Sequence, residues 1–191
     1  MVSAPKLYML LLGCKPNGRH TEQHDIFFSI GLSLKDLVPA ILEFWPEAAP
    51  KIHIDAWREV TAVNGYVIRV ASREAMPAIA AAAQSPAVEP RLFFINLGGY
   101  KENEFEEFHY KIITVASDKQ MAITQGKRTA FFKHAQSAHV DDKYGVDVDD
   151  IYDIADILPA GIKDQYRLIV TPQPGIAEDP MHMGYFRLDA L

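Results

Sequence analysis

The chain has few of the sequence features that most directly indicate a function. Cys14 is its one cysteine, which excludes an internal disulfide and suits the reducing cytoplasm. The net charge is −6, whereas binding to nucleic acid or to an anionic membrane depends on a positive field. No apolar run approaches the roughly 20 residues that span a bilayer. The sequence therefore predicts a cytoplasmic protein that binds neither nucleic acid nor a membrane.

The common catalytic and cofactor motifs are missing as well. Gly126-Lys127 is not followed by the Ser or Thr of a P-loop, and no nucleophile elbow, H-E-x-x-H, paired C-x-x-C or dinucleotide fingerprint occurs. The acidic stretch 141–156 fails the EF-hand pattern, because Tyr152 and Leu158 stand where Gly and Glu are required. That stretch is more typical of a solvated strand edge. We predict no cofactor and no metal site.

What the sequence does contain is an internal repeat. The segment 7–31 recurs at a fixed offset as 92–116, and five residues match without a gap. These are Leu7, Leu12, Gly13, Glu22 and His24, which fall on Leu92, Leu97, Gly98, Glu107 and His109. In each segment one apolar run ends at the Gly and another follows the His. We expect two copies of one unit.

The periodicities of the first copy predict a strand–strand–helix–strand–strand unit. An apolar run and an alternating segment predict strands at 7–12 and 22–30. Ser33 is a plausible N-cap of a helix that reaches Trp45, in which Pro39 predicts a kink or a late start. Alternation returns at 51–60 and 66–70, on either side of Asn64-Gly65, a strong hairpin signal.

The second copy repeats this order. We expect strands at 92–97, 107–116, 146–154 and 166–170. Asp118 should cap a helix that runs to about residue 138. We expect this helix to break at Gly126, because glycine costs about 1 kcal/mol against alanine there. The predicted fold class is α+β, with two tandem ββαββ repeats packed as a pseudo-dimer.

The domain boundary is predicted in the Ala- and Pro-rich stretch 72–90, read as a short helix followed by a linker. The first repeat with its linker then spans residues 1–86, and the second repeat with a C-terminal tail spans residues 87–191. The tail either packs back as a short strand or stays apart from the body.

These segments together resemble a known family. The runs LGCK…TEQHD and HIDAWREV…NGY, and later LFFINLGGY…EEFH and HVDDKYGVDVDDI, resemble bacterial proteins of the Domain of Unknown Function 1543 family, over residues 7–172. Members carry one or two copies of the domain, and this chain looks like a two-copy member. The resemblance implies two roll-like, β-grasp-like α+β units and implies no activity. The second copy departs from the first around its helix and lacks the Asn-Gly turn.

The strongest candidate site is a Glu-x-His pair, Glu22 with His24 and Glu107 with His109. Residues two apart on a strand point the same way, so a carboxylate and an imidazole would lie side by side. Such a pair could bind a divalent metal or act as an acid–base couple. Alternatively it is structural, because its face continues into apolar residues. The two side chains would then hydrogen-bond each other or a neighbouring loop backbone and fix the long turn after Gly13.

Two further features are candidates for ligand binding. The loop after Gly13 carries Lys15 and Arg19, which could hold an anion or could be ordinary solvated charges. Trp57 and Arg58 could form a protein-binding hot spot, or could be a core residue beside a surface residue. We therefore expect a non-catalytic binding or protein-interaction module, with an unknown small molecule or protein as partner and room for a homo-oligomer. The alternative is a metal-assisted or acid–base enzyme that uses the Glu-x-His pair.

Overall fold

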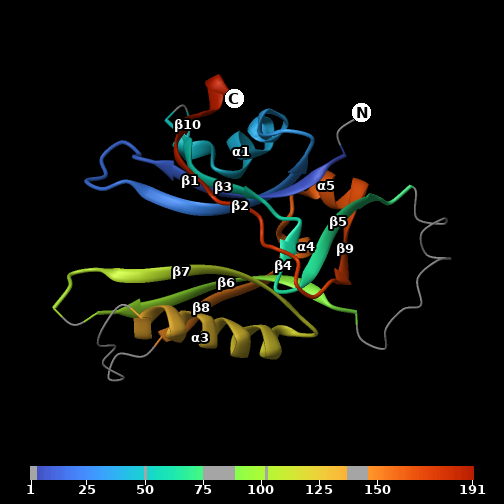
Figure 1. Ribbon diagram of the computed structural model, residues 1–191. Helices are drawn as coiled ribbons and strands as arrows, with labels where there is room; N and C mark the ends of the chain where they lie inside the picture. The colour runs from blue at the N-terminus through green and yellow to red at the C-terminus, as the bar shows by residue number, and fades with distance from the viewer. Residues whose placement is uncertain (1–3, 50, 75–88, 102, 137–145) are drawn as a thin grey trace. The chain divides into compact units, whose positions relative to one another are not determined.

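The computed structural model describes residues 4–49, 51–74, 89–101, 103–136 and 146–191, and its contacts divide the chain into two units (Figure 1). The first unit comprises Met1–Ala82 and Leu158–Leu191, and the second comprises Ala83–Ile157. Both combine helices with antiparallel sheets, so the predicted α+β class is confirmed. The sequence predicts one division, after residue 86, whereas in the structure the C-terminal segment groups with the first unit.

The first unit is built on a four-stranded sheet in the order β10–β3–β1–β2. The central strand β1 (Lys6–Cys14) pairs antiparallel with β2 (Gln23–Gly31) and with β3 (His53–Glu59). The last strand, β10 (His182–Arg187), pairs antiparallel with β3 (Figure 1). The tail therefore packs back as a short strand, which is one of the two outcomes that the sequence predicts.

One face of this sheet is covered by short helices: η1 (Leu34–Leu37), α1 (Val38–Phe44) and η2 (Pro46–Ala48). The backbone N–H of Ser33 donates to the Asp36 carboxylate at 2.9 Å, which fixes the start of η1. Pro39 lies in the first turn of α1, where its missing N–H forfeits no helical bond, so the helix starts late as predicted. The helices bury a core against the sheet: Tyr8, Leu10, Leu12, Phe27, Leu37, Ile41 and Ile54.

A second sheet of the first unit has the order β4–β5–β9. Its strands are β4 (Ala62–Val63), β5 (Tyr66–Ser72) and β9 (Tyr166–Pro172), with α5 (Ala160–Gln165) before β9 and η3 (Leu188–Ala190) at the C-terminus. Asn64 and Gly65 have φ values of 49° and 79°, which confirms the predicted hairpin turn between β4 and β5.

The second unit is a three-stranded sheet in the order β7–β6–β8, with helix α3 along one face (Figure 1). Its elements are β6 (Arg91–Tyr100), β7 (Glu107–Ala116), α3 (Lys119–Gln136), β8 (Val146–Asp153) and α4 (Ile154–Ile157). Phe93, Ile95 and Leu97 form the core beneath α3. They are the repeat partners of Tyr8, Leu10 and Leu12, which pack under the helices of the first unit.

The predicted helix of the second copy forms, with one correction. Asp118 caps it as predicted, since its Oδ1 accepts the Met121 N–H at 2.8 Å. The expected break at Gly126 is wrong, because α3 continues through it. A Cβ at Gly126 would lie 2.9 Å from Ile95 Cδ1, so the glycine lets the helix approach the sheet closely.

Two further expectations concern the stretch 72–90 and the acidic strand β8. The short helix expected in 72–90 falls mainly on residues 75–88, which lie outside the described residues. The acidic strand β8 lies at the edge of its sheet, as predicted.

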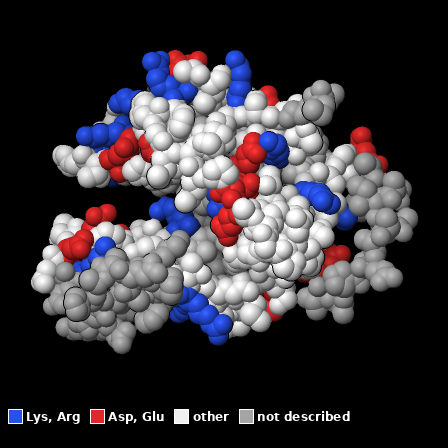
Figure 2. Space-filling view, viewed as in Figure 1, with Lys and Arg blue, Asp and Glu red and all other residues white. Residues whose placement is uncertain are grey.

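None of the described helices is long and apolar enough to cross a membrane. On the face of the molecule seen in Figure 2, acidic and basic side chains are interspersed.

Candidate functional site

The candidate site of the first unit forms around Gly13, near the end of the central strand β1. Gly13 pairs with His24 of β2 on one side and with His53 of β3 on the other. Directly paired residues of antiparallel strands point to the same face, so both imidazoles lie on one side of the sheet. It is the face opposite to the helices, since neighbouring Leu12 points into the core.

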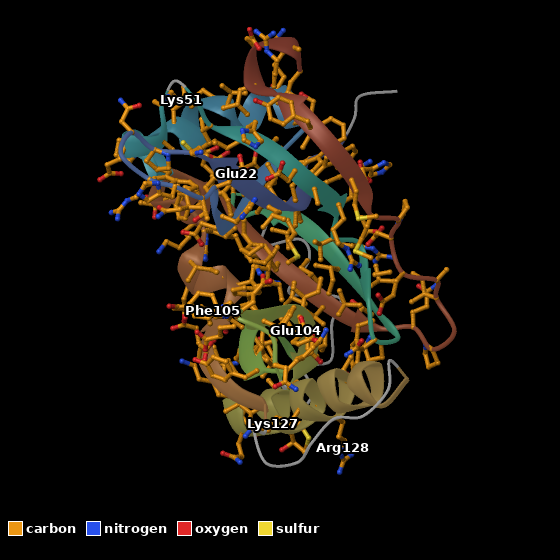
Figure 3. The ribbon with its side chains drawn as sticks, turned by 90° about the vertical axis from the view of Figure 1, so that its left-hand side faces the viewer. Glu22, Lys51, Glu104, Phe105, Lys127 and Arg128 are labelled. Atoms are coloured by element: carbon orange, nitrogen blue, oxygen red, sulfur yellow. The ribbon has the colours of Figure 1, made fainter. Side chains whose placement is uncertain are left out.

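A β-bulge brings a carboxylate to the same place. The register between β1 and β3 shifts between Leu11 and Leu12, so that Asp55 has no direct partner. A bulge re-aims a side chain, and here the Asp55 carboxylate lies over Gly13. Glu22, just before β2, contributes a second carboxylate (Figure 3).

The two carboxylates bridge the two imidazoles. His53 Nε2 lies 3.1 Å from Glu22 Oε1 and 3.3 Å from Asp55 Oδ1. His24 Nε2 lies 3.2 Å from Asp55 Oδ2 and 3.7 Å from Glu22 Oε2. Each carboxylate therefore presents one oxygen to each histidine. We call Glu22, His24, His53 and Asp55 the Gly13 cluster.

The hydrogen bond of His53 defines its chemistry. His53 is only 4% exposed, and its Nδ1 lies 3.1 Å from the Lys51 carbonyl oxygen. A carbonyl can only accept, so Nδ1 carries a proton and, in the neutral ring, Nε2 carries the lone pair. His53 Nε2 is buried and has no hydrogen-bond partner, because neither neighbouring carboxylate oxygen lies in a suitable direction. Asp55 Oδ2 is likewise buried without a hydrogen-bond partner.

Gly13 is required by this arrangement. A Cβ at position 13 would collide with Asp55 Oδ2 and would lie 2.7 Å from His53 Nε2. Only a residue without a side chain leaves room for both groups over β1. The cluster thus depends on the Gly that ends the first apolar run of the repeat.

The Gly13 cluster is partly open to solvent. The side chains of Glu22 and His24 are 42% and 40% exposed, whereas His53 lies beneath them. The ring of Tyr185, from β10, packs on the His53 ring with centroids 4.2 Å apart and planes tilted by 34°. The C-terminal strand therefore forms one wall of the site.

The second unit has a related cluster around Gly98. Gly98 pairs with His109 of β7, and the register with β8 shifts between Asn96 and Leu97, which leaves Asp149 at a bulge. A Cβ at Gly98 would lie 2.6 Å from both carboxylate oxygens of Asp149. His109 Nδ1 lies 3.1 Å from Asp149 Oδ2, and His109 Nε2 lies 3.9 Å from Glu107 Oε2.

The two clusters differ at two positions: the residue opposite the glycine, and the residue that corresponds to Leu11. At the position of His53, opposite the glycine, β8 has Asp147. At the position of Leu11, β6 has Asn96, whose Nδ2 donates to Asp149 Oδ2 at 3.3 Å and lies 3.4 Å from His109 Nδ1. Hydrogen bonds thus occupy His109 and Asp149, and no buried imidazole is described at this cluster.

The predicted Glu-x-His pairs therefore belong to larger clusters. His24 lies within ion-pair distance of Glu22, at 3.7 Å, and closer to Asp55, at 3.2 Å. Sequence reasoning missed His53, Asp55 and Asp149 as site residues. The usable signal was the alternating His53-x-Asp55 pair on a predicted strand, but its register against Gly13 is not readable from sequence.

The other candidates lie elsewhere. Lys15 and Arg19 are exposed, and no hydrogen bond or ion pair of the described residues joins either side chain to Glu22 or His24. The Gly126-Lys127 segment lies on α3, with Lys127 projecting outward rather than forming a phosphate loop (Figure 3).

Trp57 and Arg58 contact the C-terminal segment. Trp57 packs against the core and stacks on His182 at 4.0 Å between ring centroids. The Arg58 side chain is 11% exposed, and its Nη2 lies 3.9 Å from carboxylate oxygens of Glu178 and Asp179. Both residues are therefore engaged by the chain's own tail, and Arg58 is not the simple surface residue of the alternative reading.

Comparison with known families and structures places this site in context. Residues 19–70 match the sequence model described as Domain of Unknown Function (DUF1543). This segment of the first unit is therefore similar to the DUF1543 family. The matched segment contains all four residues of the Gly13 cluster. The match covers one segment of the first unit, so two-copy membership stays a prediction.

A structural relative extends the comparison to nearly the whole chain. A protein described as Il1583 from Idiomarina loihiensis has a crystal structure that is similar with a TM-score of 0.55 and 23% sequence identity, over 96% of this chain and 97% of that one. At this identity the likeness shows the fold alone. None of the curated proteins compared with this chain matches it.

Proposed function

We propose that the first unit of this protein binds one divalent transition-metal ion through His53, Glu22 and Asp55. The chain is then a binding module, as the sequence analysis expects, but its ligand includes a metal that the sequence analysis did not predict. The supporting observation is the buried, unpartnered Nε2 of His53 between two carboxylate oxygens.

Electrostatics support a cation at this point. With Nδ1 bonded to a carbonyl, neutral His53 aims a lone pair at the region that Glu22 and Asp55 face, and all three groups are acceptors. Three acceptors that face one point repel one another, and a cation between them would offset that repulsion. His53 Nε2 makes no hydrogen bond to either oxygen, whereas a metal ion between them would contact all three ligands at once.

The spacing of the ligand atoms matches a small metal ion. Ligands that lie 2.0–2.1 Å from Zn²⁺ in a tetrahedron are about 3.3 Å apart. The observed separations from His53 Nε2 are 3.1 Å and 3.3 Å. An imidazole among the ligands disfavours Ca²⁺ and Mg²⁺, which prefer oxygen. The Lys51 carbonyl that holds Nδ1–H is the usual outer support of a metal-binding histidine.

Titration of the metal-free chain with Zn²⁺ tests the proposal. Calorimetry should show one equivalent that binds tightly in the wild type and is lost in His53→Ala. His109→Ala is the control, because it removes the exposed imidazole of the second unit, which is the repeat partner of His24 and not of His53, and it should keep that equivalent. The proposal fails if the wild type binds no Zn²⁺, or if both variants bind it alike.

A second candidate is acid–base catalysis by His24, the enzyme alternative of the sequence analysis. It is supported by the position of His24 Nε2, exposed and 3.2 Å from the Asp55 carboxylate. That geometry orients an imidazole for proton transfer. Turnover of a small substrate that is lost in His24→Ala, with Zn²⁺ affinity unchanged, would favour this candidate. If no reaction depends on His24, the binding role stands alone.

We also propose that the two repeats, residues 1–86 and 87–191, descend from one ββαββ ancestor and pair as a pseudo-dimer. Strand orders β2–β1–β3 and β7–β6–β8 correspond, and in both units an Asp sits at a bulge beside the repeat glycine. Such agreement in register supports duplication more strongly than five matching letters do. An experimental structure in which Asp55 and Asp149 occupied different registers would contradict it.

A further inference from the structure

The face of β10 beside the Gly13 cluster carries large apolar side chains that are left exposed. Met183 is 80% exposed and Tyr185 is 67% exposed. Met183 pairs with Ala56 of β3, and Ala56 pairs with Leu11 of β1, so all three point to the face that carries the cluster. The contact of Tyr185 with His53 places its ring on that face too.

Tyr185 contacts the face of the His53 ring and not its ligand atom. The two ring planes are tilted by 34° with centroids 4.2 Å apart, whereas the lone pair of Nε2 lies in the imidazole plane. Tyr185 can therefore hold His53 in position without covering the place where a metal would bind. Because most of the Tyr185 surface stays exposed, its outer side is free to stack on a planar ligand.

The proposed metal would also keep an open coordination position. His53, Glu22 and Asp55 supply three ligands, and the outer part of the cluster is exposed through Glu22 and His24. Three protein ligands with a free fourth position are typical of metal sites that bind a small molecule. Because zinc can expand from four to five ligands, an oxygen-chelating group, which takes two positions, fits beside the three protein ligands.

We infer that the site binds a small organic ligand with an oxygen-chelating head on the metal and a planar apolar body against Tyr185 and Met183. This inference rests on the proposed metal site and adds the class of ligand. Tyr185 and Met183 would determine specificity, since they touch the body of the ligand and the metal holds its head.

A pair of hydroxamates tests the ligand class on the full-length, Zn²⁺-loaded chain. Benzohydroxamate and acetohydroxamate carry the same chelating head and differ in the aromatic ring. By calorimetry, benzohydroxamate should bind the wild type roughly threefold to tenfold more tightly, as expected for one aromatic contact. Tyr185→Ala should remove this preference, and Tyr185→Phe, which keeps the ring, should retain it.

The outcomes separate the two proposals. Zn²⁺ affinity of each variant is measured first, so a change in hydroxamate binding is not confused with loss of the metal. If Zn²⁺ binds and the two hydroxamates bind equally, or neither binds, the ligand class is refuted and the metal site stands. If Tyr185→Ala keeps the preference, Tyr185 is not the specificity residue. If the wild type takes up no Zn²⁺, both proposals fall.

Discussion

Gly13→Ala is the substitution that most selectively attacks the proposed site. The new Cβ would lie 2.7 Å from His53 Nε2, about 0.7 Å inside ordinary contact distance, and would collide with Asp55 Oδ2. Both groups must therefore move, and a metal site tolerates little displacement of its ligands. The overpacking costs about 1–3 kcal/mol, partly offset by the 0.5–1 kcal/mol that a strand gains when alanine replaces glycine.

The loss of Zn²⁺ binding should change the measured stability more than the altered packing does. At a free Zn²⁺ concentration of 100 times Kd, binding stabilises the wild type by about 2.7 kcal/mol. For a chain of this size that corresponds to a rise in Tm of roughly 5–11 °C. We expect Gly13→Ala to show a Zn²⁺-induced rise close to zero, because its ligands are displaced.

Thermal unfolding with and without Zn²⁺ measures this difference. Gly161→Ala is the matched control, since nothing lies within 4 Å of a Cβ built there and its φ is not in the left-handed region. That variant should keep the whole Zn²⁺-induced rise. A full rise in Gly13→Ala would refute the reasoning that the glycine makes room for a metal-binding cluster.

Three further expectations follow from buried groups outside the cluster. Cys14 is buried and donates to the Ala48 carbonyl at 3.4 Å, and burial raises the pKa of its thiol. Ellman's reagent should therefore label Cys14 only as fast as the chain unfolds, and rapid labelling in native buffer would contradict this. Burial raises the pKa of the Asp153 carboxyl above its ordinary 3.8, so the favourable contribution of that carboxyl is present below this value and is lost as pH rises through the raised pKa. The stability of Asp153→Asn against urea, measured relative to the wild type, should therefore be higher at pH 7 than at pH 4, because asparagine cannot titrate. The opposite trend would refute the burial argument. Thr61→Val should destabilise the chain by about 1 kcal/mol, because Thr61 Oγ1 donates to the partly buried Asp179 carboxylate at 2.5 Å. An unchanged urea midpoint would show that this tail contact contributes little.

The sequence predicted the elements well because their signals are local. Alternation, the Asn64-Gly65 turn and the Asp118 cap each depend on residues close in the chain, and all three appear in the structure. Gly126 was misjudged because helix propensity ignores Ile95, which requires a residue without a side chain at that point.

The site was only half predictable for a different reason. Glu22 and His24 were found because the repeat marks them, but their partners come from another strand. His53 and Asp55 reach Gly13 through the pairing of β1 with β3 and through a bulge, and the position of a bulge has no reliable local signal. The tail is similar, since nothing near Tyr185 in sequence indicates that it will contact His53.

The most direct test of the metal site is the ¹⁵N NMR spectrum of the His53 imidazole during addition of Zn²⁺. We predict that Nε2 shifts to the position of a metal-bound nitrogen while Nδ1 keeps its proton toward the Lys51 carbonyl. Unchanged His53 signals at saturating Zn²⁺ would contradict the metal site at the centre of this account.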